Sequence, residues 1–181
     1  MTVHARVLLM TAAVPVVASA VLTAAPAGAA ADRVRGEGPL VRYAAAVPEG
    51  ATARVQAVAT SSGKTVVTLH VWGLQAATQY GAHAHTRACG AGPADAGPHY
   101  QDQVAPAGHA ADTAWANPDN EVWLDLTTSG AGNGSAQSVV DWQFRAGAAG
   151  SVVIHAQQTA AGPDGAAGTA GPRLACLSVG F

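Results

Sequence analysis

The feature that most constrains the fold of this chain is a succession of short apolar or alternating segments separated by turns rich in glycine. No segment reads as a convincing helix, and we interpret the abundant alanine as compositional bias rather than as a helix signal. Regular short strands joined by such turns indicate an all-β fold, an antiparallel sandwich or barrel of about eight strands. The expected strands cover residues 41–47, 53–59, 65–74, 81–86, 121–126, 138–144, 151–156 and 174–179.

Side chains alternate between the two faces of a strand, so residues at i and i+2 lie on the same face. Residues 121–126 follow this pattern, with Val122, Leu124 and Leu126 set against Glu121, Trp123 and Asp125. Two other segments, 89–120 and 157–172, are too long to be simple turns and are rich in alanine, glycine and proline. Long ordered loops in a compact domain tend to carry function, so we expect two functional loops.

Four histidines fall where one site could recruit them. His83 and His85 are two residues apart on an expected strand and therefore project from the same face. His99 follows in the first long loop, and His155 ends the apolar run Ser151-Val-Val-Ile-His155. Imidazole suits copper, zinc, iron and nickel, and the spacing alone does not name the metal. We favour a copper site held by these four residues.

The two ends of the chain differ in character. Residues 1–31 resemble a secretory signal, with an apolar stretch followed by small residues that offer cleavage sites, and 32–181 would form one domain. Removal of that segment would leave eight basic and eleven acidic side chains, a net charge of −3. With no basic patch, nucleic acid is not an expected partner, and no later stretch is long and apolar enough to cross a membrane.

The chain has two cysteines, Cys89 and Cys176. In an oxidising compartment they can pair, and export would fit such use. The alternative is a pair of free thiols that act as metal ligands.

Four sequence blocks together resemble the copper/zinc superoxide dismutase family. They are Gly81-Ala-His83-Ala-His85, Ala96-Gly-Pro-His99-Tyr100, Val152-Val-Ile-His155-Ala156 and Gly168-Thr-Ala-Gly-Pro-Arg173-Leu-Ala-Cys176. They occur in the order that the family shows and span most of residues 66–178. The resemblance implies an eight-stranded Greek-key barrel. Because residues 1–31 resemble a secretory signal, we expect the protein to act outside the cytoplasm, secreted or in the cell envelope.

The resemblance also implies the chemistry. Copper would be held by His83, His85, His99 and His155, and a disulfide would join Cys89 to Cys176. Arg173 would lie at the mouth of the copper channel and attract superoxide, a small anion. The implied reaction is dismutation of superoxide to oxygen and hydrogen peroxide, with His99 releasing copper on reduction and delivering a proton.

The chain departs from the family pattern at the zinc site. After His99 the first long loop has one further histidine, His109, and Asp112 follows it in an arrangement that resembles the family's ligand pair. A second alignment places Asn117 where the zinc aspartate should be. Structural zinc requires four ligands, so we expect copper without a normal zinc site. The second long loop carries one charge, Asp164, and resembles that of the secreted bacterial, copper-only members.

Two functions therefore compete at this point. The first is a copper-dependent superoxide dismutase, and the second is a dismutase-like module that sequesters or delivers copper without turnover. Arg173 favours the enzyme, because copper storage has no need of a group that attracts anions. A structural domain without metal is a third reading, which the four matched histidines oppose.

Overall fold

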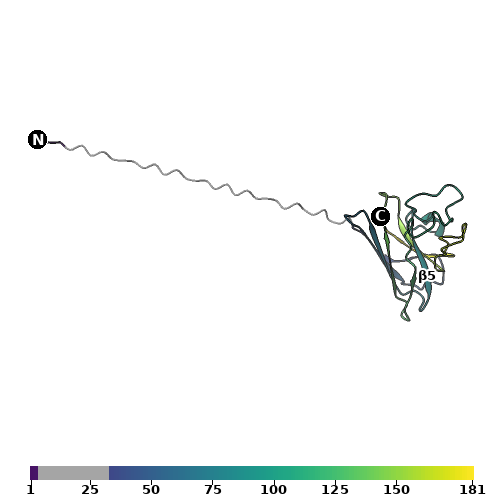
Figure 1. Ribbon diagram of the computed structural model, residues 1–181. Coiled ribbons are helices and arrows are strands. Elements are labelled where there is room, and N and C mark those ends of the chain that lie inside the picture. The colour runs from purple at the N-terminus through teal and green to yellow at the C-terminus, as the bar shows by residue number, and fades with distance from the viewer. Residues whose placement is uncertain (4–32) are drawn as a thin grey trace.

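Two antiparallel sheets pack against each other across a shared apolar core (Figure 1). The first sheet has the order β1 (Arg33–Pro39), β3 (Thr52–Ala59), β4 (Thr65–Trp72) and β7 (Gly134–Val140). The second has the order β2 (Val41–Arg42), β9 (Arg173–Ser178), β8 (Ser151–His155), β5 (Gln79–His85) and β6 (Leu126–Thr127). The expected all-β class, a sandwich or barrel, is confirmed.

This computed structural model describes residues 1–3 and 33–181. The predicted signal segment, 1–31, therefore lies almost entirely outside the described residues. Within the described part, no helix has the length and apolar character needed to cross a membrane.

The outer face of the second sheet carries the functional side chains. Along β5, Ala82 and Ala84 belong to the core between the sheets, so His83 and His85 project from the opposite face. That opposite face is also buried, and both histidines have 0% exposure. Side chains on both faces of β5 are covered because the core lies on one side and the long loops lie on the other.

The strand bounds differ from expectation near the N-terminus. β1 was not predicted, because its sequence, RVRGEGP, offers one large apolar side chain, Val34, on its inward face. The structure pairs β1 with β3 along its whole length, from Arg33 opposite Val58 to Pro39 opposite Thr52. Of the predicted strand 41–47, β2 forms and the remainder turns. The described residues thus form nine strand segments, one more than expected.

Two further segments shift. The predicted strand 138–144 is observed as β7, which begins at Gly134 and ends at Val140, four residues earlier than predicted at each end. The predicted strand 121–126 makes isolated bridges at Glu121 and Trp123 and a regular strand only at β6. The alternation within it is nevertheless present, because Val122, Leu124 and Leu126 are buried.

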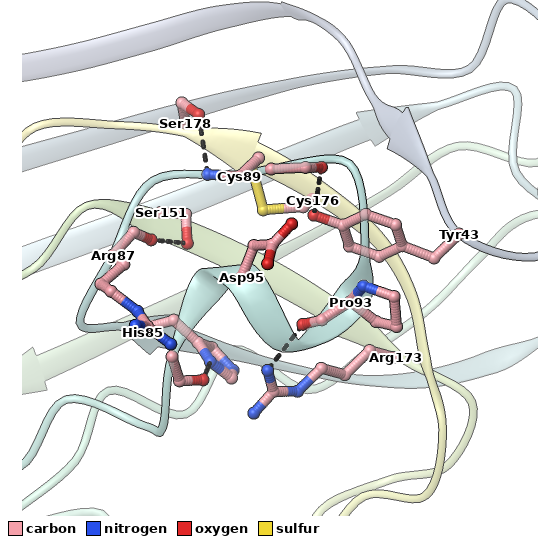
Figure 2. The surroundings of a disulfide bond; sticks show 12 residues. Tyr43, His85, Arg87, Cys89, Pro93, Asp95, Ser151, Arg173, Cys176 and Ser178 are labelled. Atoms are coloured by element: carbon pink, nitrogen blue, oxygen red, sulfur yellow. Dashed lines mark hydrogen bonds between the residues drawn. A yellow bond between two sulfur atoms is a disulfide. The ribbon is translucent and has the colours of Figure 1, made fainter.

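Both long loops fold over the outer face of the second sheet. The first contains a single 3-10 turn, η1 (Pro93–Ala96), which packs against β9. The disulfide Cys89–Cys176 ties this loop to β9, with the two Cα atoms 5.8 Å apart (Figure 2). The expected disulfide is confirmed, and the alternative of thiolate ligands is wrong.

Candidate metal centre

The four predicted histidines come together in one cluster. His83 and His85 lie on β5, and His155 lies on the adjacent β8, where it pairs with Gly81. His99 lies in the first long loop. A β-bridge to His85 and a 2.8 Å hydrogen bond from Tyr100 N to the Ala84 carbonyl hold this part of the loop against β5. One ring nitrogen of each histidine lies within 4.8 Å of those of the other three. Neighbouring strands therefore position three of the four histidines, and the first long loop adds the fourth.

Backbone carbonyls orient two of the imidazoles. His85 Nδ1 lies 2.9 Å from the Gly97 carbonyl oxygen, and His155 Nδ1 lies 3.2 Å from that of Gly171. A carbonyl only accepts, so each Nδ1 carries the proton and each Nε2 is left with a lone pair. These two Nε2 atoms face each other at 3.3 Å. Two lone pairs at that distance repel, and a cation between them would relieve the repulsion.

His83 is oriented the other way round. Its Nε2 lies 2.7 Å from the Thr159 hydroxyl, which in turn lies 2.5 Å from Asp125 Oδ1. The Asp125 carboxylate accepts from the hydroxyl, so the hydroxyl oxygen accepts from His83 Nε2–H. The lone pair of His83 is therefore on Nδ1. Among the described residues, that nitrogen is the one buried side-chain polar atom without a hydrogen-bond partner.

A glycine allows Thr159 to reach this position. A Cβ atom on Gly81 would lie 2.6 Å from the Gln157 carbonyl oxygen and 2.8 Å from the Ala170 Cβ. Both distances are too short for real contacts, so the second long loop can approach β5 this closely only because residue 81 has no side chain. Gly81 therefore allows the second long loop to lie where Thr159 can form a hydrogen bond with His83.

His99 is held by a buried carboxylate. Its Nδ1 donates to Glu121 Oε2 over 2.9 Å, which leaves Nε2 as the nitrogen free to bind a metal. Glu121 is 1% exposed and also accepts from Trp123 Nε1 at 2.9 Å and from Gln101 Nε2 at 2.8 Å. Three donors thus compensate the burial of this carboxylate.

Burial keeps the other three imidazoles neutral. It lowers the pKa of His83 well below its ordinary value, with the neighbouring His99 adding to the effect. Burial likewise lowers the pKa of His85 to about 2 and that of His155 to about 4. Metal ligation requires deprotonated imidazole. At neutral pH these three residues therefore present lone pairs with no proton to displace.

The donor set fits a metal ion that prefers nitrogen ligands. Four imidazoles converge, their second nitrogens are fixed by carbonyls, a hydroxyl and a carboxylate, and a buried lone pair of His83 is unpartnered. Such hydrogen bonding of the second ring nitrogen is typical of metal-bound histidine. Imidazole suits copper and zinc more than calcium or magnesium.

The predicted zinc candidates lie apart from this cluster. His109 Nδ1 pairs with Asp112 Oδ2 at 2.7 Å, and Asp112 Oδ1 accepts from Gly165 N at 3.1 Å. Within residues 33–181, the four histidines form the one group of three or more side chains that lie close enough together to hold a metal ion. Neither His109 nor Asp112 belongs to that group. The atom of His99 that a second metal would need is already bonded to Glu121.

Arg173 lies beside the cluster. It lines a cavity of about 380 Å3 together with His99 and Glu121. Its Nη1 donates to the Pro93 carbonyl over 2.7 Å, which anchors the side chain against η1 (Figure 2). The guanidinium is near enough to the histidines for its charge to help lower the pKa of His85.

Sequence reasoning missed Glu121, Asp125 and Thr159 as residues of the site. Glu121 and Asp125 lie on the polar face of residues 121–126, opposite the face that carries Val122. The available signal was the presence of two carboxylates, those of Glu121 and Asp125, on one face of a segment whose other face is buried. Thr159 gave none, because its role depends on a contact with His83, 76 residues away.

Comparisons with known proteins agree with this geometry. The family model described as copper/zinc superoxide dismutase (SODC) matches residues 50–179. No curated protein matches the chain. Among solved structures, the crystal structure of the clock protein EA4 is similar with a TM-score of 0.58 and 20% identity, covering 83% of this chain and 94% of that one. At that identity the likeness shows the fold alone. The match over residues 50–179 takes in the whole histidine cluster, and the chain belongs to the copper/zinc superoxide dismutase family.

Proposed function

We propose that this protein is a copper-dependent superoxide dismutase that works with copper alone. The observation that carries the proposal is the position of Arg173, which shares one cavity with His99 of the four-imidazole cluster. A cluster that only stored metal would gain nothing from a positive group at its entrance. A cluster that consumes a small anion would gain both attraction and orientation.

The copper would be held by Nδ1 of His83 and by Nε2 of His85, His99 and His155, the atoms that the hydrogen bonds leave free. Bound copper supplies one-electron redox chemistry, by which one superoxide is oxidised to oxygen and a second, with two protons, is reduced to hydrogen peroxide. The chain's residues orient the ligands, limit access to the cluster and attract the anion.

His99 has the second chemical role that we propose. It is the most exposed of the four ligands and lines the cavity, so its Nε2 is the ring nitrogen best placed to hand a proton to bound substrate. The Glu121 carboxylate keeps the other proton on Nδ1. This fixed orientation is what a zinc ion at Nδ1 would otherwise provide, and it supports function without zinc.

We also propose that the protein acts outside the cytoplasm. The disulfide Cys89–Cys176 is compatible with an oxidising compartment. The signal segment 1–31 supports the same proposal on its sequence alone. Superoxide that arises outside the cell membrane would then be the substrate.

The test combines metal analysis with superoxide consumption on the purified mature chain. We expect about one copper and little zinc per chain, and we expect Arg173→Ala to lower the rate several-fold with copper content unchanged. The rate of the wild type should fall as salt rises, and that of Arg173→Ala should fall less. Two tightly held metals, one of them zinc, would contradict the copper-only proposal. Full copper loading without any dismutation would leave the binding module as the function.

A further inference from the structure

A second arginine lies near Arg173 on the outer face of the molecule. Arg87 and Arg173 line one open groove, and the other residues that line it carry no charge: Pro93, Ala94, Gly97, Pro98, Gly171 and Pro172. Gly97 and Gly171 in this groove are the residues whose carbonyls hold His85 and His155. The groove therefore lies directly against the loops that support the metal centre.

One short turn anchors both guanidinium groups. Arg173 Nη1 donates to the carbonyl of Pro93 over 2.7 Å, and Arg87 Nη2 donates to that of Ala94 over 3.2 Å. Pro93 and Ala94, which carry the two carbonyls, are consecutive in η1. The turn itself is fixed, because Ala96 is fully buried against Cys176 of the disulfide. Two positive charges are thus held close together although they repel.

Within residues 33–181, no carboxylate neutralises either guanidinium. Among the described residues, the ion pairs within 4.0 Å include neither Arg87 nor Arg173. The nearest acidic residue in sequence, Asp95, accepts from Gly92 N at 2.8 Å. Asp164, the one charge in the facing loop, accepts from Thr113 instead. Burial lowers the pKa of Arg173 from its ordinary value, and the positive charge of Arg87 acts in the same direction.

We propose that Arg87 and Arg173 form one anion-capturing groove, in which Arg87 is an outer positive charge that draws small monovalent anions toward Arg173 and the metal centre. The inference rests on the proposed function for the identity of the natural anion, superoxide. It adds a guiding residue that is not part of any of the four sequence blocks. Its physical basis is a pair of anchored, unpaired positive charges in a chain whose total charge is negative.

The size of the effect follows from Coulomb's law. A unit charge about 10 Å from the anion in water changes the local anion concentration by about twofold. Salt removes most of that gain, because the screening length falls from about 10 Å at 0.1 M to about 3 Å at 1 M. Capture by Arg87 therefore predicts a twofold, salt-sensitive effect.

The experiment compares Arg87→Gln with Arg87→Lys and with a control, Arg33→Gln, all loaded with copper. Arg33 is exposed on β1 in the other sheet, so its variant makes the same change in net charge away from the groove. Two readouts are measured against ionic strength. One is the rate of superoxide consumption, and the other is the affinity of the copper(II) protein for azide, followed by absorbance.

We expect Arg87→Gln to lower both quantities about twofold at low ionic strength and to match the wild type at high ionic strength. Arg87→Lys and Arg33→Gln should behave as the wild type does. If Arg87→Gln, with full copper and an unchanged melting temperature, gives the same azide affinity and salt dependence as Arg33→Gln, the inference is wrong. If the wild type consumes no superoxide, the proposed function fails, and the azide titration decides the role of Arg87 independently.

Discussion

Replacing Glu121 by glutamine tests whether this carboxylate supports the site. Glutamine keeps the size of the side chain, and its one oxygen can replace Oε2, which accepts from His99 and Trp123. The amide NH2 then replaces Oε1 and meets Gln101 Nε2, so two donors face each other at a distance of about 2.8 Å. Rotating the Gln101 amide gives no relief, because its oxygen accepts from Ala105 N and its nitrogen donates to the Ala110 carbonyl.

The magnitude follows from these contacts. A buried donor without an acceptor costs about 1–3 kcal/mol, and hydrogen bonds to a charged group contribute about 1.5–3 kcal/mol against about 1 kcal/mol for neutral ones. We therefore expect Glu121→Gln to lower the free energy of unfolding of the metal-free protein by about 3 kcal/mol. For a domain of about 150 residues this corresponds to a fall in melting temperature of about 6–12 °C.

The assay is thermal unfolding of the metal-free protein followed by circular dichroism. The control is Glu49→Gln, which removes a carboxylate whose side chain is 89% exposed and should leave the melting temperature nearly unchanged. A Glu121→Gln variant that melts within about 2 °C of the wild type would refute the reasoning, since the amide would then satisfy the same donors. With copper bound, the variant should also show altered ligand-field spectra, because His99 would no longer be held by a charge.

Three other perturbations test separate parts of the structure. Thr159→Val removes the hydroxyl between His83 and Asp125, and we expect copper affinity, measured by competition with a chelator, to fall about 10- to 100-fold. Unchanged affinity would exclude a role for that hydroxyl. Replacing both cysteines by alanine removes a link between residues 87 apart in sequence, and denaturant unfolding should show a loss of about 4–5 kcal/mol, whereas a loss below about 1 kcal/mol would contradict the chain-entropy argument. The third perturbation is pH. The pKa of His155 is lowered to about 4 in the folded protein, so the unfolded chain takes up this proton first, near its ordinary value of 6.5. The metal-free protein should therefore be most stable above about pH 6.5 and lose stability as pH falls toward 4, and a flat profile over that window would contradict the burial of neutral imidazole.

The fold class and the placement of His83 and His85 on one face of a strand could be predicted from the sequence because both rest on local patterns. Alternation with a period of two identifies a strand wherever one face is buried, and it places His83 and His85 on one face without any tertiary information. The same reasoning failed for β1, whose inward positions are mostly glycine. Gly36 is one of these inward positions, and its lack of a side chain leaves room for Val179. A Cβ atom at residue 36 would lie 2.7 Å from the Val179 Cγ2 atom.

The tertiary structure alone decided how the four imidazoles are oriented and which carboxylate holds His99. Glu121 meets His99 across 22 residues, and Thr159 meets His83 across 76, and neither spacing is a local pattern. The same holds for the two arginines, whose anchors in η1 depend on a loop that the disulfide fastens to β9. A sequence specifies which face a side chain takes along its own strand. The side chain that approaches from a distant segment is determined only after the loops close and the packed core fixes the positions of those loops.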